Sequence, residues 1–501
     1  MAASEMNREA SAVRPLIASF WFWVGAITVV RILLLPIADG GLGPDEAQYW
    51  YWAQSFDFGY FSKPPMIAWI IAAFTGLFGD AAWAVRLPAP LLQAGAGVFV
   101  YLTAKRLFSP QIAFWAGLGW LTLPGVILSS SLITTDGPLL LFWSGAFYCL
   151  VRIIDGDQHK PTDFAALGAM IGLGLLSKYA MTYFIAALAI TLVTSQTARR
   201  AFAQPQAAIA AGIAIALISP NLIWNIQHDF QTVAHTAANA NWGSDLFKPG
   251  KLAGFAISQF AVFGIIPFAV LAAVVFMTAR GAAFLNATGA AQRMLLIFAL
   301  TPLFIVSMQA FISRAHANWA ATAYPAAIIL VTALLMRNGK AWLAKLNVGL
   351  HALGMTVFTI AMTNFSLLDR LGAGRAVAEL RGWETMTAAI AAEAAPGDVI
   401  LFDDRSMIAE MLYHQRDQNL NIATLDPNAG VHHHYEAVLP FDARFHEEAL
   451  FVSILPTDAH VNYRFRTIIP RGFVSGDLGV GEQRTFYLFD LDDYYGPNDK
   501  K

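Results

Sequence analysis

Long apolar runs separated by short polar segments make up most of the chain before residue 364. A helix needs about 20 apolar residues to cross the hydrocarbon of a bilayer, so these runs predict about eleven membrane-spanning helices. They lie at 16–38, 85–104, 110–128, 135–154, 163–177, 179–196, 206–224, 252–279, 292–312, 319–336 and 344–363. Residues 65–78 form another apolar run, too short to cross comfortably, which predicts an interfacial or re-entrant helix.

After about residue 364 the pattern changes to short apolar runs between charged and turn-forming segments. Three runs have the length and composition of strands and one that of a helix, in α/β alternation. The strands are expected at 398–403, 450–455 and 484–491, and the helix at 406–414. The predicted fold class is a polytopic α-helical membrane protein with a small α/β C-terminal domain. The expected domains are a membrane domain at 1–363 with an outer loop at 39–84, a linker at 364–384, and a soluble domain at 385–501.

Composition supports a membrane protein and excludes some classes of partner. Of the 501 residues 57% are hydrophobic and 13% charged, whereas soluble domains carry about 25% charged residues. The net charge of −2 gives no reason to expect nucleic-acid binding. The single cysteine, Cys149, cannot form an internal disulfide.

Lysines and arginines are concentrated in alternate loops, which predicts an orientation. These loops include Lys105 with Arg106, Arg199 with Arg200, and Arg337 with Lys340. If they face the cytoplasm, the outer loop at 39–84 and the C-terminal domain lie on the outer side. We therefore expect a multi-pass membrane protein whose first outer loop and C-terminal domain lie outside the cytoplasm.

The predicted outer loops contain the unusual charged residues, and Asp45 and Glu46 are the first of them. Asp45 is the candidate catalytic residue, a general base that removes a proton from an incoming hydroxyl. Glu46 is expected to shape the environment of Asp45 or to bind the substrate. The structural alternative is an amphipathic helix beginning at Pro44 with an acidic first turn.

Cations on the outer side contradict the general positive-inside trend, so each needs a local reason. Lys63 follows Tyr60 in a loop made rigid by two prolines, and Lys178 joins two apolar runs. A bound anion such as a phosphate explains these charges. The alternative is ion pairing with Asp45, Glu46 or Asp136 and no ligand. Arg86 fits either an anion contact or a side chain that snorkels to the interface.

Two outer segments offer hydrogen-bonding groups beside tryptophans, the chemistry that suits a sugar. One spans 219–242 and includes His235 and Asn239, and the other includes Arg314 and His316. Residues 432–434 are three histidines, but no partner spacing accompanies them, so a solvated loop is expected and no metal site. The candidate substrate-binding residues are Glu46, Tyr60, Lys63, Arg86, Asp136, Lys178, His235, Asn239, Arg314 and His316.

This set of motifs resembles the GT-C membrane glycosyltransferases, specifically the family of protein O-mannosyltransferases and ArnT-like lipid A aminoarabinose transferases. The resemblance rests on Asp45-Glu46, Lys63-Pro64-Pro65, Arg86-Leu87-Pro88, Asp136 and Lys178. Residues 219–221, 235–237 and 314–319 also resemble a bacterial subgroup that transfers galacturonate from a polyprenyl phosphate to lipopolysaccharide core or lipid A.

The resemblance implies a polyprenyl-phosphate sugar donor, an acidic catalytic residue at Asp45, and contacts from Lys63 and Lys178 to the lipid phosphate. It also implies a location in the inner membrane, with the active site and the C-terminal domain on the periplasmic side. ArnT-like enzymes often have Glu before the Lys-Pro-Pro motif, where this chain has Ser62. In those enzymes the glutamate can help to hold a metal. Because this chain lacks it, we expect no required cofactor, and a divalent metal ion is the disfavoured alternative.

The predicted function is an inverting glycosyltransferase with a polyprenyl-phosphate sugar donor and an extracytoplasmic acceptor, lipid A or lipopolysaccharide core. Its expected partners are the lipid-linked donor, a glycolipid or protein acceptor, and membrane lipids. One alternative is a protein O-mannosyltransferase-like enzyme. A transporter or flippase of lipid-linked sugars is another, although transporter sites lie near the bilayer midplane and often between repeats. A non-catalytic lipid-binding scaffold is the third.

Overall fold

The computed structural model describes residues 19–156, 160–242, 246–279, 289–425, 431–442, 448–462 and 464–495. It divides into two compact units. The membrane unit comprises residues 1–35, 63–70 and 86–359, so far as they are described, and the sheet unit comprises 36–62, 71–85 and 360–501. The sheet unit thus contains most of the predicted first outer loop as well as the C-terminal segment.

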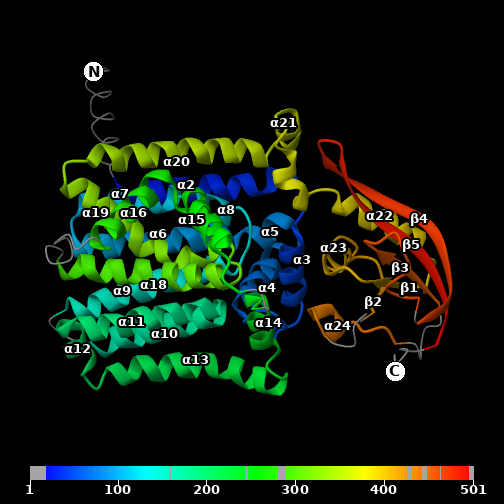
Figure 1. Cartoon of the computed structure of the whole chain (residues 1–501), viewed down its shortest axis with the longest axis horizontal. Helices are drawn as coiled ribbons and strands as arrows, with labels where there is room; N and C mark the ends of the chain where they lie inside the picture. The colour runs from blue at the N-terminus through cyan, green and yellow to red at the C-terminus, as the bar shows by residue number, and fades with distance from the viewer. Residues whose placement is uncertain are drawn as a thin grey trace. The chain divides into compact units, whose positions relative to one another are not determined.

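Helices account for the regular structure of the membrane unit, and every predicted apolar run contains an α-helix (Figure 1). The helices are α2 Phe20–Leu34, α6 Pro88–Leu107, α7 Pro110–Thr122, α8 Pro124–Ser129, α9 Asp136–Ile154, α10 Pro161–Ser177, α11 Thr182–Thr194, α12 Gln196–Phe202, α13 Ala207–Gln227, α14 Gln231–Ala240, α15 Pro249–Phe263, α16 Ile265–Ala279, α18 Ala290–Ile312 and α19 Tyr324–Arg337. Short 3₁₀ turns are η1 Leu35–Ile37, η2 Tyr179–Met181 and η3 Ala317–Ala323. Helices α4 Met66–Phe78, α5 Ala82–Arg86 and α20 Ala341–Met362 each have residues in both units.

Among the described residues, seven helices are long and apolar enough to cross a membrane, or eight if a pair bent by 112° counts as one span. The protein is therefore a multi-pass membrane protein, but the hydropathy pattern predicted about eleven spans. The difference arises because several predicted runs form short helices. Helices 161–177 and 265–278, for example, have only 10–17 residues.

Two predicted spans are broken into separate helices. In 110–128 the break falls at Leu123, whose ψ of 138° is extended as expected for a residue before proline. In 252–279 it falls at Gly264, whose φ of +94° is the left-handed conformation that favours glycine. A Cβ at Gly264 would also lie 2.2 Å from His351 Nε2, so no larger residue fits this break.

Small residues allow close packing inside the membrane unit. Helix α10 packs against both α9 and α13 (Figure 1). A Cβ on Gly168 of α10 would stand 2.3 Å from the carbonyl oxygen of Ala210 on α13, so glycine permits the contact. The core of the unit contains large aromatic side chains such as Trp120, Trp143 and Phe298.

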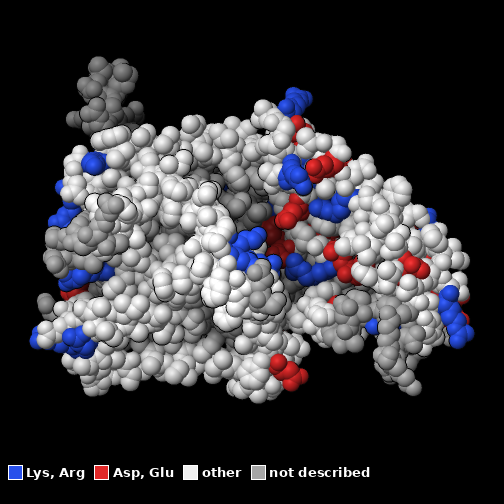
Figure 2. Space-filling model, viewed as in Figure 1, with Lys and Arg blue, Asp and Glu red and all other residues white. Residues whose placement is uncertain are grey.

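Charged side chains are sparse on the face of the membrane unit that Figure 2 shows. Two ion pairs tie helix ends together: Arg106 Nε lies 3.1 Å from Asp155, and Arg152 Nη2 lies 2.6 Å from Asp163. The ends of α6 and α9 and the start of α10 therefore share one face of the unit. This agrees with the predicted alternation of basic loops, while the side of the membrane stays a prediction.

The sheet unit is built on a five-stranded mixed sheet of order β2-β1-β3-β5-β4. The strands are β1 Val399–Phe402, β2 Asn421–Thr424, β3 Ala449–Ser453, β4 Phe465–Gly479 and β5 Glu482–Tyr494. Strand β1 is parallel to β2 and β3, whereas β5 is antiparallel to β3 and β4. Its helices are α3 Pro44–Ala53, α21 Phe365–Arg370, α22 Trp383–Glu393, α23 Arg405–His414 and α24 His434–Val438, with η4 Gly374–Leu380.

The structure confirms the predicted fold class and the strands expected at 398–403, 450–455 and 484–491. Strands β1 and β3 are buried along their whole length, as continuous apolar runs indicate. Helix α23 leaves the carboxyl end of β1 and confirms the helix expected at 406–414. Strands β2 and β4 were not predicted. Strand β4 is mostly exposed and contains Pro470 and Gly472 at a register shift.

Candidate active site

Helix α3 begins at Pro44 in the first outer loop. The two carboxylates of its first turn, Asp45 and Glu46, have different surroundings. Gly43 is extended and Pro44 occupies the first helical position. Glu46 is 4% exposed, and its Oε2 accepts a hydrogen bond from Gly43 N at 3.0 Å. This contact satisfies a free N–H at the helix start, as in a capping box. Asp45, with its side chain 64% exposed, is the accessible carboxylate of the pair.

Asp45 is held by an arginine from the C-terminal segment. Arg405 Nη2 donates to Asp45 Oδ1 at 2.8 Å, and Arg405 Nη1 donates to Gln48 Oε1, also at 2.8 Å. Arg405 is the first residue of α23, whose start is capped by Asp404 through Met407 N at 2.8 Å. Within the described residues Asp45 Oδ2 has no hydrogen-bond partner. The guanidinium therefore fixes one carboxylate oxygen and leaves the other available to accept a proton.

Further contacts fix α3 against α23. Trp50 Nε1 donates to Asp80 Oδ1 at 2.6 Å, and the Tyr413 hydroxyl donates to the Asp80 carbonyl at 2.9 Å. The rings of Trp50 and Tyr413 meet edge to face at 5.1 Å. Tyr60 stacks on Trp52 at 5.0 Å. The orientation of Asp45 thus depends on a packed aromatic interface rather than on a single ion pair.

Tyr60, a predicted substrate contact, has a structural hydrogen bond in this loop. Its hydroxyl donates to the Ser55 carbonyl at 2.7 Å. Burial, more than the nearby Asp57, raises the pKa of Tyr60 to about 12, so the phenol stays neutral. Tyr60 therefore shapes the loop, and its contact with a substrate stays a prediction.

Of the three histidines at 432–434, His432 is exposed as the expected solvated loop predicts, whereas His433 and His434 are partly buried at the start of α24. The His433 ring accepts a hydrogen bond from Glu436 N at 3.4 Å and caps α24. His434 packs edge to face on Trp52 at 5.6 Å, and burial lowers its pKa to about 4. No group of three His, Cys, Asp or Glu side chains in the described part of the chain could hold a metal ion. His433 therefore serves capping and His434 serves packing.

In the membrane unit the structure brings together two of the predicted residues. Lys178 Nζ at the end of α10 lies 2.7 Å from Asp136 Oδ1 at the start of α9. Asn318 Nδ2 donates to Asp136 Oδ2, also at 2.7 Å. The side chains of Lys178 and Asp136 are 22% and 10% exposed. Lys178 thus has the carboxylate partner that the sequence offered as the alternative to a phosphate.

A cavity of about 400 Å³ lies beside this cluster. Its polar groups come from Ser129, Thr134, Asp136, His316, Asn318 and Tyr324. The rest of the lining is mainly apolar and comes from Trp120, Leu123, Val126, Leu128, Leu132, Leu140, Val262 and Ala321. An apolar cavity with a few polar groups in its wall suits a ligand with a hydrocarbon part and a polar head.

The other predicted contacts lie in varied surroundings. Arg86 is 2% exposed, so it is not a side chain that snorkels to the surface. Lys63 is half-buried just before α4, and His235 is half-buried on α14. Asn239 also lies on α14, and its side chain is outside the described part. Arg314 is exposed, and its carbonyl accepts from Gln309 at 3.1 Å.

Arg405, Gln48 and Asn318 were not among the predicted site residues. Arg405 could have been suspected, because it follows the carboxyl end of a parallel strand, where sites gather in α/β folds. Asn318 lies between the predicted His316 and the tryptophan after it. Nothing local marks Gln48, since its role depends on Arg405, which lies 357 residues away.

Comparison with known proteins agrees with these features. The family model described as dolichyl-phosphate-mannose-protein mannosyltransferase matches residues 62–224. Lipid A galacturonosyltransferase RgtD of Rhizobium johnstonii is 33% identical over 436 residues, which are 85% of this chain and 89% of RgtD. Lipopolysaccharide core galacturonosyltransferase RgtA of the same organism is 28% identical over 204 residues, 40% of each chain.

The fold is also that of a solved enzyme. The crystal structure of ArnT from Cupriavidus metallidurans in the apo state aligns with a TM-score of 0.65 over 93% of this chain and 97% of ArnT, at 16% identity. The structure of the same protein bound to undecaprenyl phosphate aligns with a TM-score of 0.63. At this identity the likeness concerns the fold, and the family follows from the match to RgtD. The chain therefore belongs to the GT-C membrane glycosyltransferases, in the same family as RgtD.

Proposed function

We propose that this protein transfers a galacturonosyl residue from a polyprenyl-phosphate donor to lipid A, with inversion at the anomeric carbon. The protein is a glycosyltransferase that uses a polyprenyl-phosphate sugar as its donor. The observation that carries the proposal is the 33% identity to RgtD across 85% of the chain. The exposed carboxylate of Asp45 adds the chemical group that such a transfer needs.

On the acceptor side Asp45 is the general base. The acceptor hydroxyl gives its proton to Asp45 while its oxygen forms a bond to the anomeric carbon. The bond from that carbon to the phosphate oxygen breaks, and the electron pair leaves with the polyprenyl phosphate. Proton removal of this kind contributes about 10²–10⁴-fold to a rate. Arg405 is the positioning residue, because it fixes Oδ1 of the base.

On the donor side Lys178 and Lys63 are the cations for the departing phosphate. The phosphate gains negative charge as the sugar leaves, so positive groups stabilise the transition state more than the ground state. The 400 Å³ cavity beside Asp136 offers an apolar wall for the isoprenoid and polar groups for the head. Asp136, which also accepts a hydrogen bond from Asn318, holds Lys178 in place until the phosphate competes for it.

The test is reconstitution of the purified full-length protein with polyprenyl-phosphate galacturonate and lipid A, read out by mass spectrometry of the lipid. We expect a product heavier by one galacturonosyl residue. A polyprenyl-phosphate aminoarabinose donor and a serine-containing peptide acceptor serve as the competing substrates. Preferred use of either of them, or no sugar transfer at all, would contradict the proposal.

We also propose that Asp45 and the sheet unit face the periplasm from the inner membrane. The only native cysteine, Cys149, is buried, so an introduced cysteine can be labelled against a low background. Gln483 is exposed in the sheet unit, and Asn338 is exposed in a predicted cytoplasmic loop. A membrane-impermeant maleimide should label Gln483→Cys in intact spheroplasts and Asn338→Cys only after permeabilisation. The reverse pattern would place the site in the cytoplasm.

A further inference from the structure

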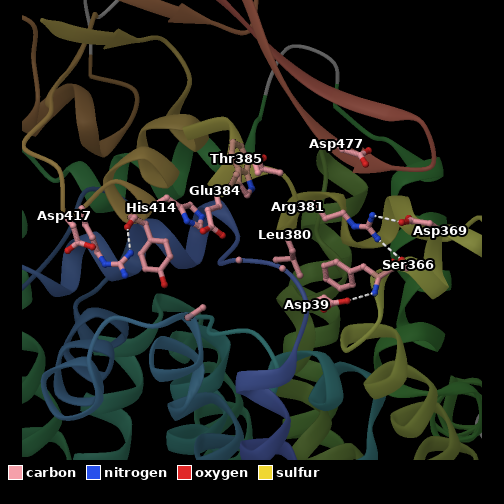
Figure 3. Close-up of a pocket in the computed structure, with 18 residues that line it drawn as sticks. Asp39, Ser366, Asp369, Leu380, Arg381, Glu384, Thr385, His414, Asp417 and Asp477 are labelled. Atoms are coloured by element: carbon pink, nitrogen blue, oxygen red, sulfur yellow. Dashed lines mark hydrogen bonds and ion pairs between the residues drawn. The ribbon is translucent and has the colours of Figure 1, made fainter. Parts of the chain in front are cut away.

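A second cavity, of about 810 Å³, lies wholly within the sheet unit (Figure 3). Three stretches of chain form most of its wall: residues 39–41, residues 365–385, and the end of α23 with the turn after it. Ala82 from α5 and Asp477 from β4 complete the lining. The function proposed above assigns no role to this cavity.

The wall of this cavity is tightly built. Gly41 N donates to the Leu380 carbonyl at 3.1 Å, and Phe365 N donates to Asp39 Oδ2 at 2.8 Å. Gly40 has a φ of +84°, and a Cβ there would lie 2.7 Å from the Phe365 ring and 2.8 Å from the Leu380 oxygen. The left-handed backbone and the close approach both require glycine. The cavity therefore has a defined wall rather than being a gap between loose loops.

The charges in the cavity select against anions. Five carboxylates line it, and only two arginines do. One of these, Arg381, is already paired with Asp369 at 2.9 Å (Figure 3). Burial, with Arg416 as the smaller cause, lowers the pKa of His414 to about 4, so this histidine is neutral at neutral pH. The resulting net negative charge disfavours a phosphate or uronate group.

Two of the carboxylates are available to a ligand. Glu384 and Asp417 are exposed, and within the described residues neither side chain has a hydrogen bond or an ion pair. An ionised carboxylate only accepts hydrogen bonds, so its partners must be hydroxyl, amide or ammonium donors. The ligand chemistry that fits is a hydroxyl-rich, neutral or amino-substituted saccharide.

The cavity is connected to Asp45 by two short pieces of structure. Helix α23 runs from Arg405, which holds Asp45, to His414 in the cavity wall. At about 1.5 Å per residue this helix is about 14 Å long. The other connection is the chain from Gly41 to Asp45, which spans at most about 14 Å. A short saccharide bound in the cavity can therefore reach the base.

We propose that this cavity binds the saccharide head group of the acceptor glycolipid, through hydrogen bonds from its hydroxyl or amino groups to Glu384 and Asp417. The proposal rests on the function proposed above, since it assigns the acceptor to the side of Asp45. It makes the sheet unit the part of the enzyme that chooses the acceptor, while the membrane unit binds the lipid-linked donor.

The test compares the full-length protein with its Glu384→Gln/Asp417→Asn variant in the lipid A transfer assay. We expect the KM for lipid A to rise about tenfold or more, because each lost bond is to a charged acceptor. The KM for the donor and the kcat at saturating lipid A should stay within about twofold of the wild-type values. An unchanged KM for lipid A would overturn the proposal.

The matched control is Glu393→Gln/Asp490→Asn, which removes two carboxylates that pair with Arg471 and do not line the cavity. This variant loses the same charge from the same unit, so its KM for lipid A should match the wild type. An equal rise in the control would mean that overall charge, not the cavity, governs acceptor binding, and would overturn the proposal.

A binding measurement separates this proposal from the proposed function. De-O-acylated lipid A is titrated into the full-length protein and binding is followed by calorimetry. The wild type and Asp45→Asn should bind alike, and Glu384→Gln/Asp417→Asn should bind at least about tenfold more weakly. If binding depends on these carboxylates but no sugar is transferred, the proposed function fails and the site stands. If transfer proceeds while wild type and variant bind equally, the site fails and the function stands.

Discussion

Arg405 and Asp45 are 360 residues apart in sequence, and their side chains meet at 2.8 Å. The same guanidinium also reaches Gln48, so it contacts two successive turns of α3. Both residues belong to the sheet unit, which therefore includes the first outer loop as well as the C-terminal strands. The proposed base of the reaction thus takes its orientation from a residue near the end of the chain.

Replacing Arg405 by glutamine should lower kcat about 10²-fold, because a misplacement of about 1 Å at a reacting group can cost that much. Arg405→Lys should recover only part of the rate, since lysine is a point charge and cannot bond Asp45 and Gln48 with one planar group. Initial rates at saturating donor and acceptor give kcat directly.

The control for Arg405 is Arg471→Gln, which removes an arginine from exposed ion pairs with Glu393 and Asp490 in the same unit. Exposed pairs contribute about 0–1 kcal/mol, so this variant should keep its thermal stability and kcat. If Arg405→Gln keeps full kcat while Arg471→Gln also does, the arginine does not position the base.

Asp45→Asn should reduce turnover by about 10²–10⁴-fold, since an amide cannot take the proton of the acceptor hydroxyl. Asp57→Asn tests the same chemical change in the same loop, at a carboxylate that accepts from Phe58 N at 2.7 Å. It should leave turnover near the wild-type value. Comparable activity of Asp45→Asn and the wild type would show that another group removes the proton.

The helices of this fold were predictable because their signal is local. An apolar run of sufficient length must be helical inside a bilayer, where every backbone N–H and C=O needs an internal partner. The breaks were harder to foresee. Gly264 lies in a run of apolar residues, and the space that a Cβ would need there is filled by His351, a residue in another helix.

The sheet was predictable only where its strands are buried. Strands β1 and β3 are fully buried, and their continuous apolar runs are typical of central strands. Strand β4 is an edge strand, mostly exposed and interrupted by Pro470 and Gly472, so it has no apolar pattern to detect. Its pairing with β5 depends on the short turn between the two strands, not on hydrophobic periodicity.

The candidate site was predictable in its residue types but not in its pairings. Charges on the predicted outer side pointed to Asp45 and Lys178, because ionised groups near a membrane are costly unless they serve a purpose. The partners came from tertiary structure. Asn318 lies 182 residues from Asp136, and Arg405 lies 360 residues from Asp45, distances over which a single sequence carries no pairing signal.

The stability of the sheet unit should fall as pH drops from 6.5 towards 4. Burial lowers the pKa of His414 and of His434 from 6.5 to about 4, so in this window the unfolded chain binds protons that the folded chain does not. Each histidine should cost about 2 kcal/mol by pH 5. His434→Phe keeps the aromatic packing on Trp52 and should lose less stability on acidification. Thermal unfolding at pH 7.5 and pH 5 tests this, and equal losses in both proteins would contradict it.

The ion pair of Lys178 and Asp136 allows a structural role to be separated from a role in donor binding. Lys178→Ala leaves Asp136, which is 10% exposed, without its cation, so the protein should lose about 1–3 kcal/mol of stability. Adding Asp136→Asn removes the uncompensated carboxylate, so the double variant should recover most of that loss. The KM for the polyprenyl-phosphate donor should stay raised in the double variant, because the cation that faces the phosphate is still missing. Thermal stability and donor KM are measured on the wild type, on each single variant and on the double variant. If KM recovers together with stability, Lys178 only holds the helices and does not bind the donor.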